Sequence, residues 1–169
     1  YEIGVRLVGS EMCIRDSFMS VIGTLLHFVY EWSGNNSIVR LFAPWNESTW
    51  EHMKLLFFPM LALVLFLFFK LPEQSPIPVA LSIGTLVGLA LIPILFYTYT
   101  GVLGFSVMAI DIAIFYISVL GVFLTGWFLK DNRKLANRSG LLLTCLVILA
   151  ILFFIFSYYP PEIGLFQEP

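Results

Sequence analysis

The chain has very little charge for its length. Only 12% of its 169 residues are Asp, Glu, Lys or Arg, and the formal net charge is −2. This weak charge offers no electrostatic basis for binding nucleic acid or an acidic substrate. The two cysteines, Cys13 and Cys145, form neither a disulfide framework nor a CxxC pair. There is also no HExxH zinc motif and no glycine-rich phosphate loop.

The chain is instead rich in apolar residues. Hydrophobic residues make up 59% of the chain, against about 45–50% in a typical soluble domain, and the mean hydropathy is +0.92. Apolar runs close to or above about 18 residues are typical of transmembrane helices. We therefore predict an all-α, polytopic transmembrane helical bundle forming a single domain over residues 18–169. Its five or so spans are expected at about 18–32, 50–71, 79–100, 107–129 and 141–159.

The first seventeen residues do not fit this pattern. Residues 7–17 read LVGSEMCIRDS and resemble, codon by codon, the translation of a transposase sequencing adaptor. We expect residues 1–17 to be a non-native leader and exclude them from arguments about fold, charge and cysteine. The first span, 18–32, then has only 15 residues, which form about 22 Å of helix. We expect this span to be truncated, because a membrane core is about 30 Å thick.

Lysine and arginine are distributed unevenly over the connections between spans. With the leader excluded, two fall on one side of the membrane, Arg40 and Lys54. Five fall on the other side, Lys70, Lys130, Arg133, Lys134 and Arg138. Basic loops face the cytoplasm in membrane proteins, so the 130–138 loop is predicted to lie inside. The chain is then N-in and C-out, with the turn at 27–54 outside.

The third span carries a Gly84-xxx-Gly88 pair. Small residues at this spacing allow two helices to approach closely in lipid. Pro59 and Pro93 fall inside expected spans. Internal prolines are tolerated there because neighbouring groups satisfy the freed carbonyl.

The polar residues of the first span share one helix face. Ser20, Thr24, His27 and Glu31 are spaced by 4, 3 and 4 residues, and His27 and Glu31 lie one turn apart. Ionisable side chains facing lipid are costly, so this face should meet other helices or water. Two interpretations stay open: a functional pair, or a polar seam between helices with Glu31 at the water interface.

The second span begins with NESTWEHMK. Ser48 and Glu51 have the spacing of a capping box, in which Ser48 accepts the Glu51 amide and Glu51 returns to the Ser48 amide. Glu47 is only partly explained by capping. His52 is not explained, because a helix N-terminus disfavours a charged imidazole. A neutral His52 would suit a ligand or a proton acceptor.

Asp111 is the acidic residue expected well inside a span. Acids at such depth are candidates for functional sites. The alternative is a structural carboxyl hydrogen-bonded to Tyr97, Tyr99 or a backbone carbonyl. On the predicted topology Asp111 lies near the outer surface, at the level of His27 and Glu31.

These titratable groups are expected to gather in the outer third of the bundle. Two imidazoles with nearby carboxylates suit Zn²⁺ or another divalent cation, and equally a proton relay or an acid–base pair. The candidate metal ligands are His27, His52, Glu47 and Asp111. The supporting polar groups are Glu31, Glu51 and Ser48.

Two strings carry a resemblance to a known family. GTLLHFVYEWSGNN and PWNESTWEHMKLLFFP resemble a family of small bacterial integral membrane proteins of unknown function. Its members show H-F-x-Y-x-W-S-G followed by N-E-S-x-W-E-H-x-K. The resemblance implies a multi-pass protein of the bacterial cytoplasmic membrane with about five spans. It implies no activity.

Three functional hypotheses follow. The first is a membrane protein whose outward His/Glu/Asp cluster binds a cation or a proton. The second is a structural or partner-binding protein, in which the 33–50 outer turn contacts another protein. The third is an intramembrane enzyme on a lipid-linked substrate, which requires a water-accessible cavity reaching Asp111. The lipid bilayer is a partner in all three.

Overall fold

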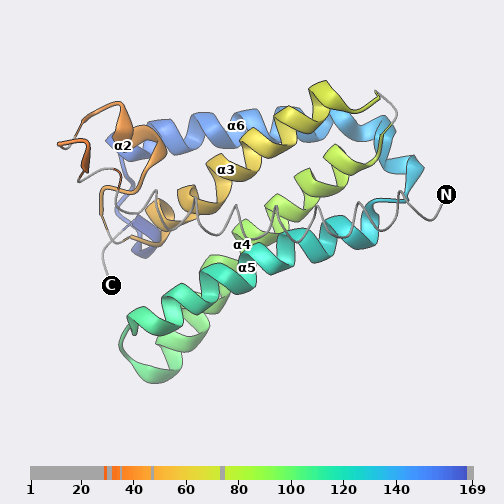
Figure 1. Cartoon of the computed structure of the whole chain (residues 1–169). Helices are drawn as coiled ribbons and strands as arrows, with labels where there is room; N and C mark the ends of the chain where they lie inside the picture. The colour runs from red at the N-terminus through yellow and green to blue at the C-terminus, as the bar shows by residue number, and fades with distance from the viewer. Residues whose placement is uncertain (1–28, 30–31, 35, 47, 73–74, 167–169) are drawn as a thin grey trace.

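The computed structural model describes residues 29, 32–34, 36–46, 48–72 and 75–166. The expected leader and nearly all of the expected first span lie outside this part of the chain. The described residues form five α-helices and two short 3₁₀ turns, η1 (Arg133–Arg138) and η2 (Gly164–Phe166). The helices are α2 (Val39–Phe42), α3 (Thr49–Lys70), α4 (Ile77–Leu103), α5 (Met108–Leu129) and α6 (Ser139–Tyr158), shown in Figure 1.

Helices α3 to α6 are each long and apolar enough to cross a membrane. Their ends differ by at most three residues from the expected ranges 50–71, 79–100, 107–129 and 141–159. The predicted all-α class is confirmed for the described residues. Pro59 lies inside α3 and Pro93 inside α4 without ending either helix.

The four long helices run alternately up and down, so the connections fall at two ends. Figure 1 shows α2, the start of α3, the α4–α5 turn and the C-terminal segment toward one end, called here the α2 end. The end of α3, the start of α4 and η1 lie toward the other, the η1 end. The N-in, C-out orientation stays a prediction.

Helices α4 and α5 pack backbone to backbone through glycine. A Cβ placed on Gly84 would overlap the carbonyl oxygen of Val122, and one on Gly88 would overlap the Val122 side chain. The close helix approach that Gly84-xxx-Gly88 allows is therefore realised, with α5 as the neighbour. Dispersion between such closely packed surfaces is a main source of helix association in lipid.

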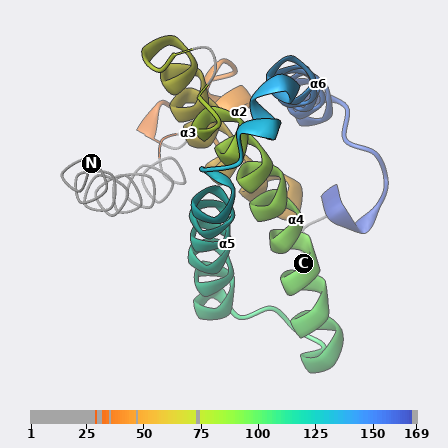
Figure 2. The same ribbon diagram turned by 90° about the vertical axis from the view of Figure 1, so that its right-hand side faces the viewer.

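Helix α6 buries few of its side chains. Its buried residues are Leu146, Phe153 and Ser157, whereas α3 buries many along its length. Figures 1 and 2 show the α4–α5 pair diverging from α3 and α6 toward the α2 end. The position of the α6 C-terminus therefore depends on contacts made locally at the α2 end.

Candidate functional site

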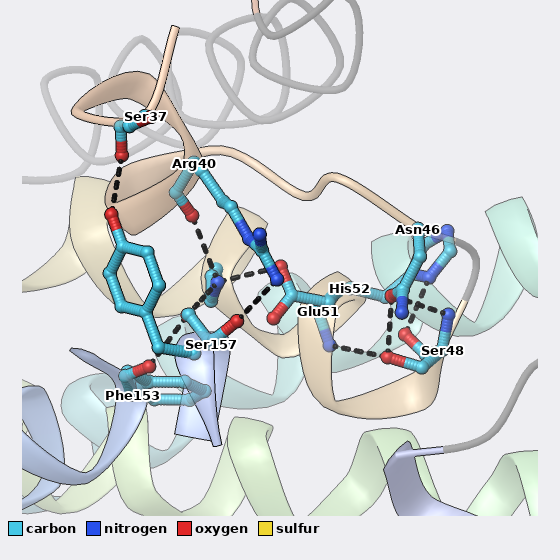
Figure 3. Close-up of polar contacts among 10 residues, drawn as sticks. Ser37, Arg40, Asn46, Ser48, Glu51, His52, Phe153 and Ser157 are labelled. Atoms are coloured by element: carbon cyan, nitrogen blue, oxygen red, sulfur yellow. Dashed lines mark hydrogen bonds and ion pairs between the residues drawn. The ribbon is translucent and has the colours of Figure 1, made fainter. Parts of the chain in front are cut away.

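A buried lysine organises the α2 end. Lys54, in the second turn of α3, is 0% exposed. Its Nζ donates hydrogen bonds to Glu51 Oε2 at 2.6 Å, to the Arg40 carbonyl oxygen at 3.1 Å and to Ser157 Oγ. The three N–H groups of the ammonium therefore have three acceptors, drawn from α2, α3 and α6. We call Arg40, Glu51, Lys54 and Ser157 the Lys54 cluster (Figure 3).

The start of α3 is set by a serine cap. Ser48 Oγ accepts the Glu51 amide at 3.3 Å, as the capping box predicts. The prediction that the Glu51 carboxylate accepts the Ser48 amide is wrong, because that amide donates to Asn46 Oδ1 at 3.2 Å instead. The Glu51 carboxylate bonds to Lys54, because a charge-assisted hydrogen bond between buried ions is stronger than a carboxylate bond to a neutral amide.

Arg40 links the short helix α2 to the end of α6. Its Nη2 donates to the Ser157 carbonyl oxygen at 2.7 Å. Its guanidinium carbon lies 3.8 Å from the centre of the Trp45 ring and 5.2 Å from the centre of the Tyr158 ring. The Tyr158 hydroxyl in turn donates to the Ser37 carbonyl oxygen at 2.9 Å. Segment 36–46 is thus held on α6 at several points.

Aromatic rings pack beside the Lys54 cluster. The Phe153 ring centre lies 4.5 Å from that of Trp50 and 4.9 Å from that of Phe57. Phe166, in η2, lies 4.9 Å from Trp50. These rings reduce access of water, and the low local dielectric strengthens the hydrogen bonds and the ion pair.

The cluster holds two cations and one carboxylate. Glu51 is paired with Lys54. Within the described residues no carboxylate forms an ion pair with Arg40, and its buried Nε has no hydrogen-bond acceptor. With these groups charged, Arg40, Glu51 and Lys54 together carry one net positive charge. Removing one partner of a buried ion pair costs about 3–5 kcal/mol.

The structure describes two of the four predicted metal ligands, His52 and Asp111. The half-buried His52 donates from Nδ1 to the Ser48 carbonyl oxygen at 3.0 Å, because a carbonyl can only accept. His27 and Glu47 lie outside the described residues, as does the supporting Glu31. Their predicted place in a site stays a prediction.

Asp111 lies in the first turn of α5 and is half-buried. It accepts a hydrogen bond from the Tyr99 hydroxyl. That hydroxyl also accepts the Val107 amide at 3.2 Å. The hydrogen bond to Tyr99 that the structural alternative named is therefore present, and the role of Asp111 in a site stays a prediction.

The predicted His/Glu/Asp cluster is not formed by its described members. Asp111 follows the α4–α5 turn, which projects away from the start of α3, where His52 lies (Figures 1 and 2). Among the residues whose positions are described, no three His, Cys, Asp or Glu side chains are placed to hold a metal ion. The described contact of His52 is with Ser48 at the start of α3, and that of Asp111 is with Tyr99 of α4, so these contacts do not join the two side chains.

Three cluster members were absent from the predicted site. Lys54 follows Glu51 by three residues on one helix face, and this spacing could have indicated an ion pair. Arg40 precedes the second span and was counted only as a loop charge. Ser157 lies 103 residues from Lys54, so no local pattern connects the two.

The fold and the four candidate spans define a helical, multi-pass class of membrane protein. Within that class, the sequence model of a family of unknown function, DUF6512, matches residues 11–169. The chain belongs to this family. The matched range contains the Lys54 cluster, and it includes residues 11–17 of the segment interpreted as adaptor-derived. No curated protein and no solved structure was found to match the chain.

Proposed function

We propose that this protein is a non-catalytic binding component of the bacterial cytoplasmic membrane. Segment 36–46 would contact the ligand or partner on the outer surface. This develops the hypothesis of a partner-binding outer turn at 33–50. The observation that carries it is the Lys54 ammonium, which joins this segment to α3 and α6.

Exposed apolar side chains on the segment support a role in recognition. Ile38 is 68% exposed, Phe42 42% and Trp45 36%. Their backbone is held by Lys54 at the Arg40 carbonyl and by Tyr158 at the Ser37 carbonyl. A surface that is already ordered loses less entropy on binding, which improves affinity. The cluster therefore supports binding by fixing the backbone that presents these side chains.

The arrangement of charge supports the predicted orientation. Lys54 is buried and paired with Glu51, so Arg40 is the cation at the α2 end that has no carboxylate partner among the described residues. The five basic residues expected inside belong to the η1 end, where Lys130 Nζ lies 3.2 Å from the centre of the Trp127 ring. This contrast favours η1 in the cytoplasm, and segment 36–46 outside.

The other two hypotheses draw less support. Cation or proton binding was predicted for His27, His52, Glu47 and Asp111, and the two of these that the structure describes bond to Ser48 and Tyr99. Intramembrane catalysis relied on Asp111, whose observed partner is a tyrosine that also caps the start of α5. A binding function is supported by contacts that the described residues make, namely those that hold the backbone of segment 36–46.

Photocross-linking in intact cells tests the binding function. The photoreactive residue p-benzoylphenylalanine would replace Ile38, Phe42 or, as a control on the apolar surface of α5, Leu120, which is 53% exposed. We expect one dominant, discrete adduct from positions 38 and 42, and a heterogeneous mixture of lipid adducts from 120. The discrete adduct should weaken in the K54M background, because the segment loses its anchor. Identical adduct patterns at all three positions would refute the proposal.

A further inference from the structure

We propose that Arg40 recognises a phosphate group carried by the ligand. This inference rests on the binding function proposed above and names its chemistry. Guanidinium is planar and presents five N–H donors in a fork that matches the oxygens of phosphate. Arg40 is half-buried at the α2 end, beside the exposed side chains of segment 36–46.

The charge of the Lys54 cluster points to an anion. The Glu51 carboxylate lies 2.6 Å from the Lys54 ammonium and balances its positive charge. No described carboxylate pairs with Arg40, and its buried Nε–H has no acceptor. A buried charged donor without an acceptor is costly. A phosphate oxygen would balance the net positive charge and accept hydrogen bonds from the guanidinium.

The guanidinium is held in place before any ligand binds. Trp45 and Tyr158 contact it through their rings, and the Ser157 carbonyl accepts one of its donors at 2.7 Å. Stacking on aromatic faces occupies the faces of the guanidinium and leaves its edge clear of the rings for in-plane contacts. Arginine, rather than lysine, is therefore the residue type that this position requires.

The depth of the site favours phosphate among anions. Arg40 lies at the level where α3 begins and α6 ends, with Trp45 and Tyr158 around it. Tryptophan and tyrosine concentrate at the level of the lipid headgroups. Both lipid phosphodiesters and free inorganic phosphate offer the same chemistry at this depth, and the experiment separates them.

The test measures thermal unfolding of the full chain in detergent during titration with phosphatidylglycerol, inorganic phosphate or diacylglycerol, which lacks phosphate. We expect phosphatidylglycerol to raise the Tm of the unmodified protein, and diacylglycerol to have no effect. R40Q should bind about tenfold more weakly, the loss expected for one charge-assisted hydrogen bond. R40K, which keeps the charge without the planar fork, should be intermediate. K134Q, at the exposed η1 end, should respond as the unmodified protein does.

Each result has a defined meaning. An equal response to phosphatidylglycerol and diacylglycerol, or R40Q binding as tightly as the unmodified chain, would overturn the inference. A response to inorganic phosphate alone would identify free phosphate as the source and keep the role of Arg40. If R40Q fails to fold, as judged by circular dichroism, the comparison between R40K and K134Q decides, and equal binding by these two refutes the role of Arg40.

The cross-linking experiment separates this inference from the binding function. Discrete adducts from position 38 with no effect of R40Q would overturn the phosphate inference alone. If the unmodified background gives no discrete adduct at positions 38 and 42 while the R40Q effect is intact, only the contact through the exposed apolar side chains of segment 36–46 is overturned.

Discussion

Lys54 and Ser157 are 103 residues apart in the sequence, and the ammonium of one donates a hydrogen bond to the hydroxyl of the other. This contact joins the start of α3 to the last turn of α6. Ser157 Oγ also donates to the Phe153 carbonyl oxygen at 2.7 Å, which fixes the position of its hydroxyl. Because α6 buries few other residues, the pair has a large part in holding its C-terminal end.

Replacing Lys54 by methionine should destabilise the fold by about 3–5 kcal/mol, because Glu51 is left as an unpaired buried charge. Unfolding in a denaturing detergent titration measures the change. The double variant E51L/K54M should lose less stability than K54M alone, since neither charge is then buried. K70M, at the exposed end of α3, is the matched control. A double variant that is less stable than K54M would contradict this explanation.

Ser157→Ala should cost about 1–3 kcal/mol, the loss expected when a buried donor loses its acceptor. Thr144→Ala is the matched control on the same helix. Thr144 also bonds to the carbonyl four residues earlier, Gly140, but it is exposed. Equal stability losses in the two variants would show that the Lys54 contact adds nothing beyond the local bond. The same unfolding titration measures both.

Gly84→Ala should destabilise by about 1–3 kcal/mol, because its methyl group would overlap the Val122 backbone and force α4 and α5 apart. Gly101→Ala lies on the same helix with no atom within 4 Å of the added Cβ. It should be neutral or stabilising by up to about 1 kcal/mol, from helix propensity. Thermal unfolding compares the two, and a Gly84 variant as stable as the Gly101 variant would show that the helix contact is looser.

Tyr99→Phe should destabilise the start of α5, because Asp111 and the Val107 amide both lose their bond to the hydroxyl. The cost should be about 1–3 kcal/mol. Hydrogen exchange should be faster at Val107 and the residues that follow it, and unchanged in α3. Tyr97→Phe on the same helix is the control. Unchanged exchange in the Tyr99 variant would mean that water replaces the hydroxyl at no cost.

Cysteine labelling tests the orientation. In a background with Cys13 and Cys145 replaced by serine, a membrane-impermeant maleimide should label N36C in intact cells. It should label N132C, beside η1, only after the membrane is permeabilised. This outcome follows from placing the basic η1 end in the cytoplasm. The opposite labelling pattern would reverse the topology and move the Lys54 cluster to the inner surface.

Local features of the chain were predictable from the sequence. Four spans could be placed because apolar length is a property of one continuous segment. The Ser48 cap could be predicted because its donor, the Glu51 amide, lies three residues away. Gly84 and Gly88 indicated a helix-packing face, because their spacing places them on one side of α4. The helix that packs there could not be named, since pairing of spans depends on the whole bundle.

The choice among competing partners was decided by tertiary structure. By itself, the sequence predicted an all-helical chain with about five spans, four of which the structure describes as helices long enough to cross a membrane. It also placed Glu51 and His52 at the start of a span and Asp111 inside one. It could not show that Glu51 bonds to Lys54 rather than to the Ser48 amide, or that Asp111 meets Tyr99 rather than an imidazole. Such choices depend on which groups share a buried, low-dielectric space. Helix packing brought Ser157 to Lys54 across 103 residues and made the loop charge Arg40 part of the site.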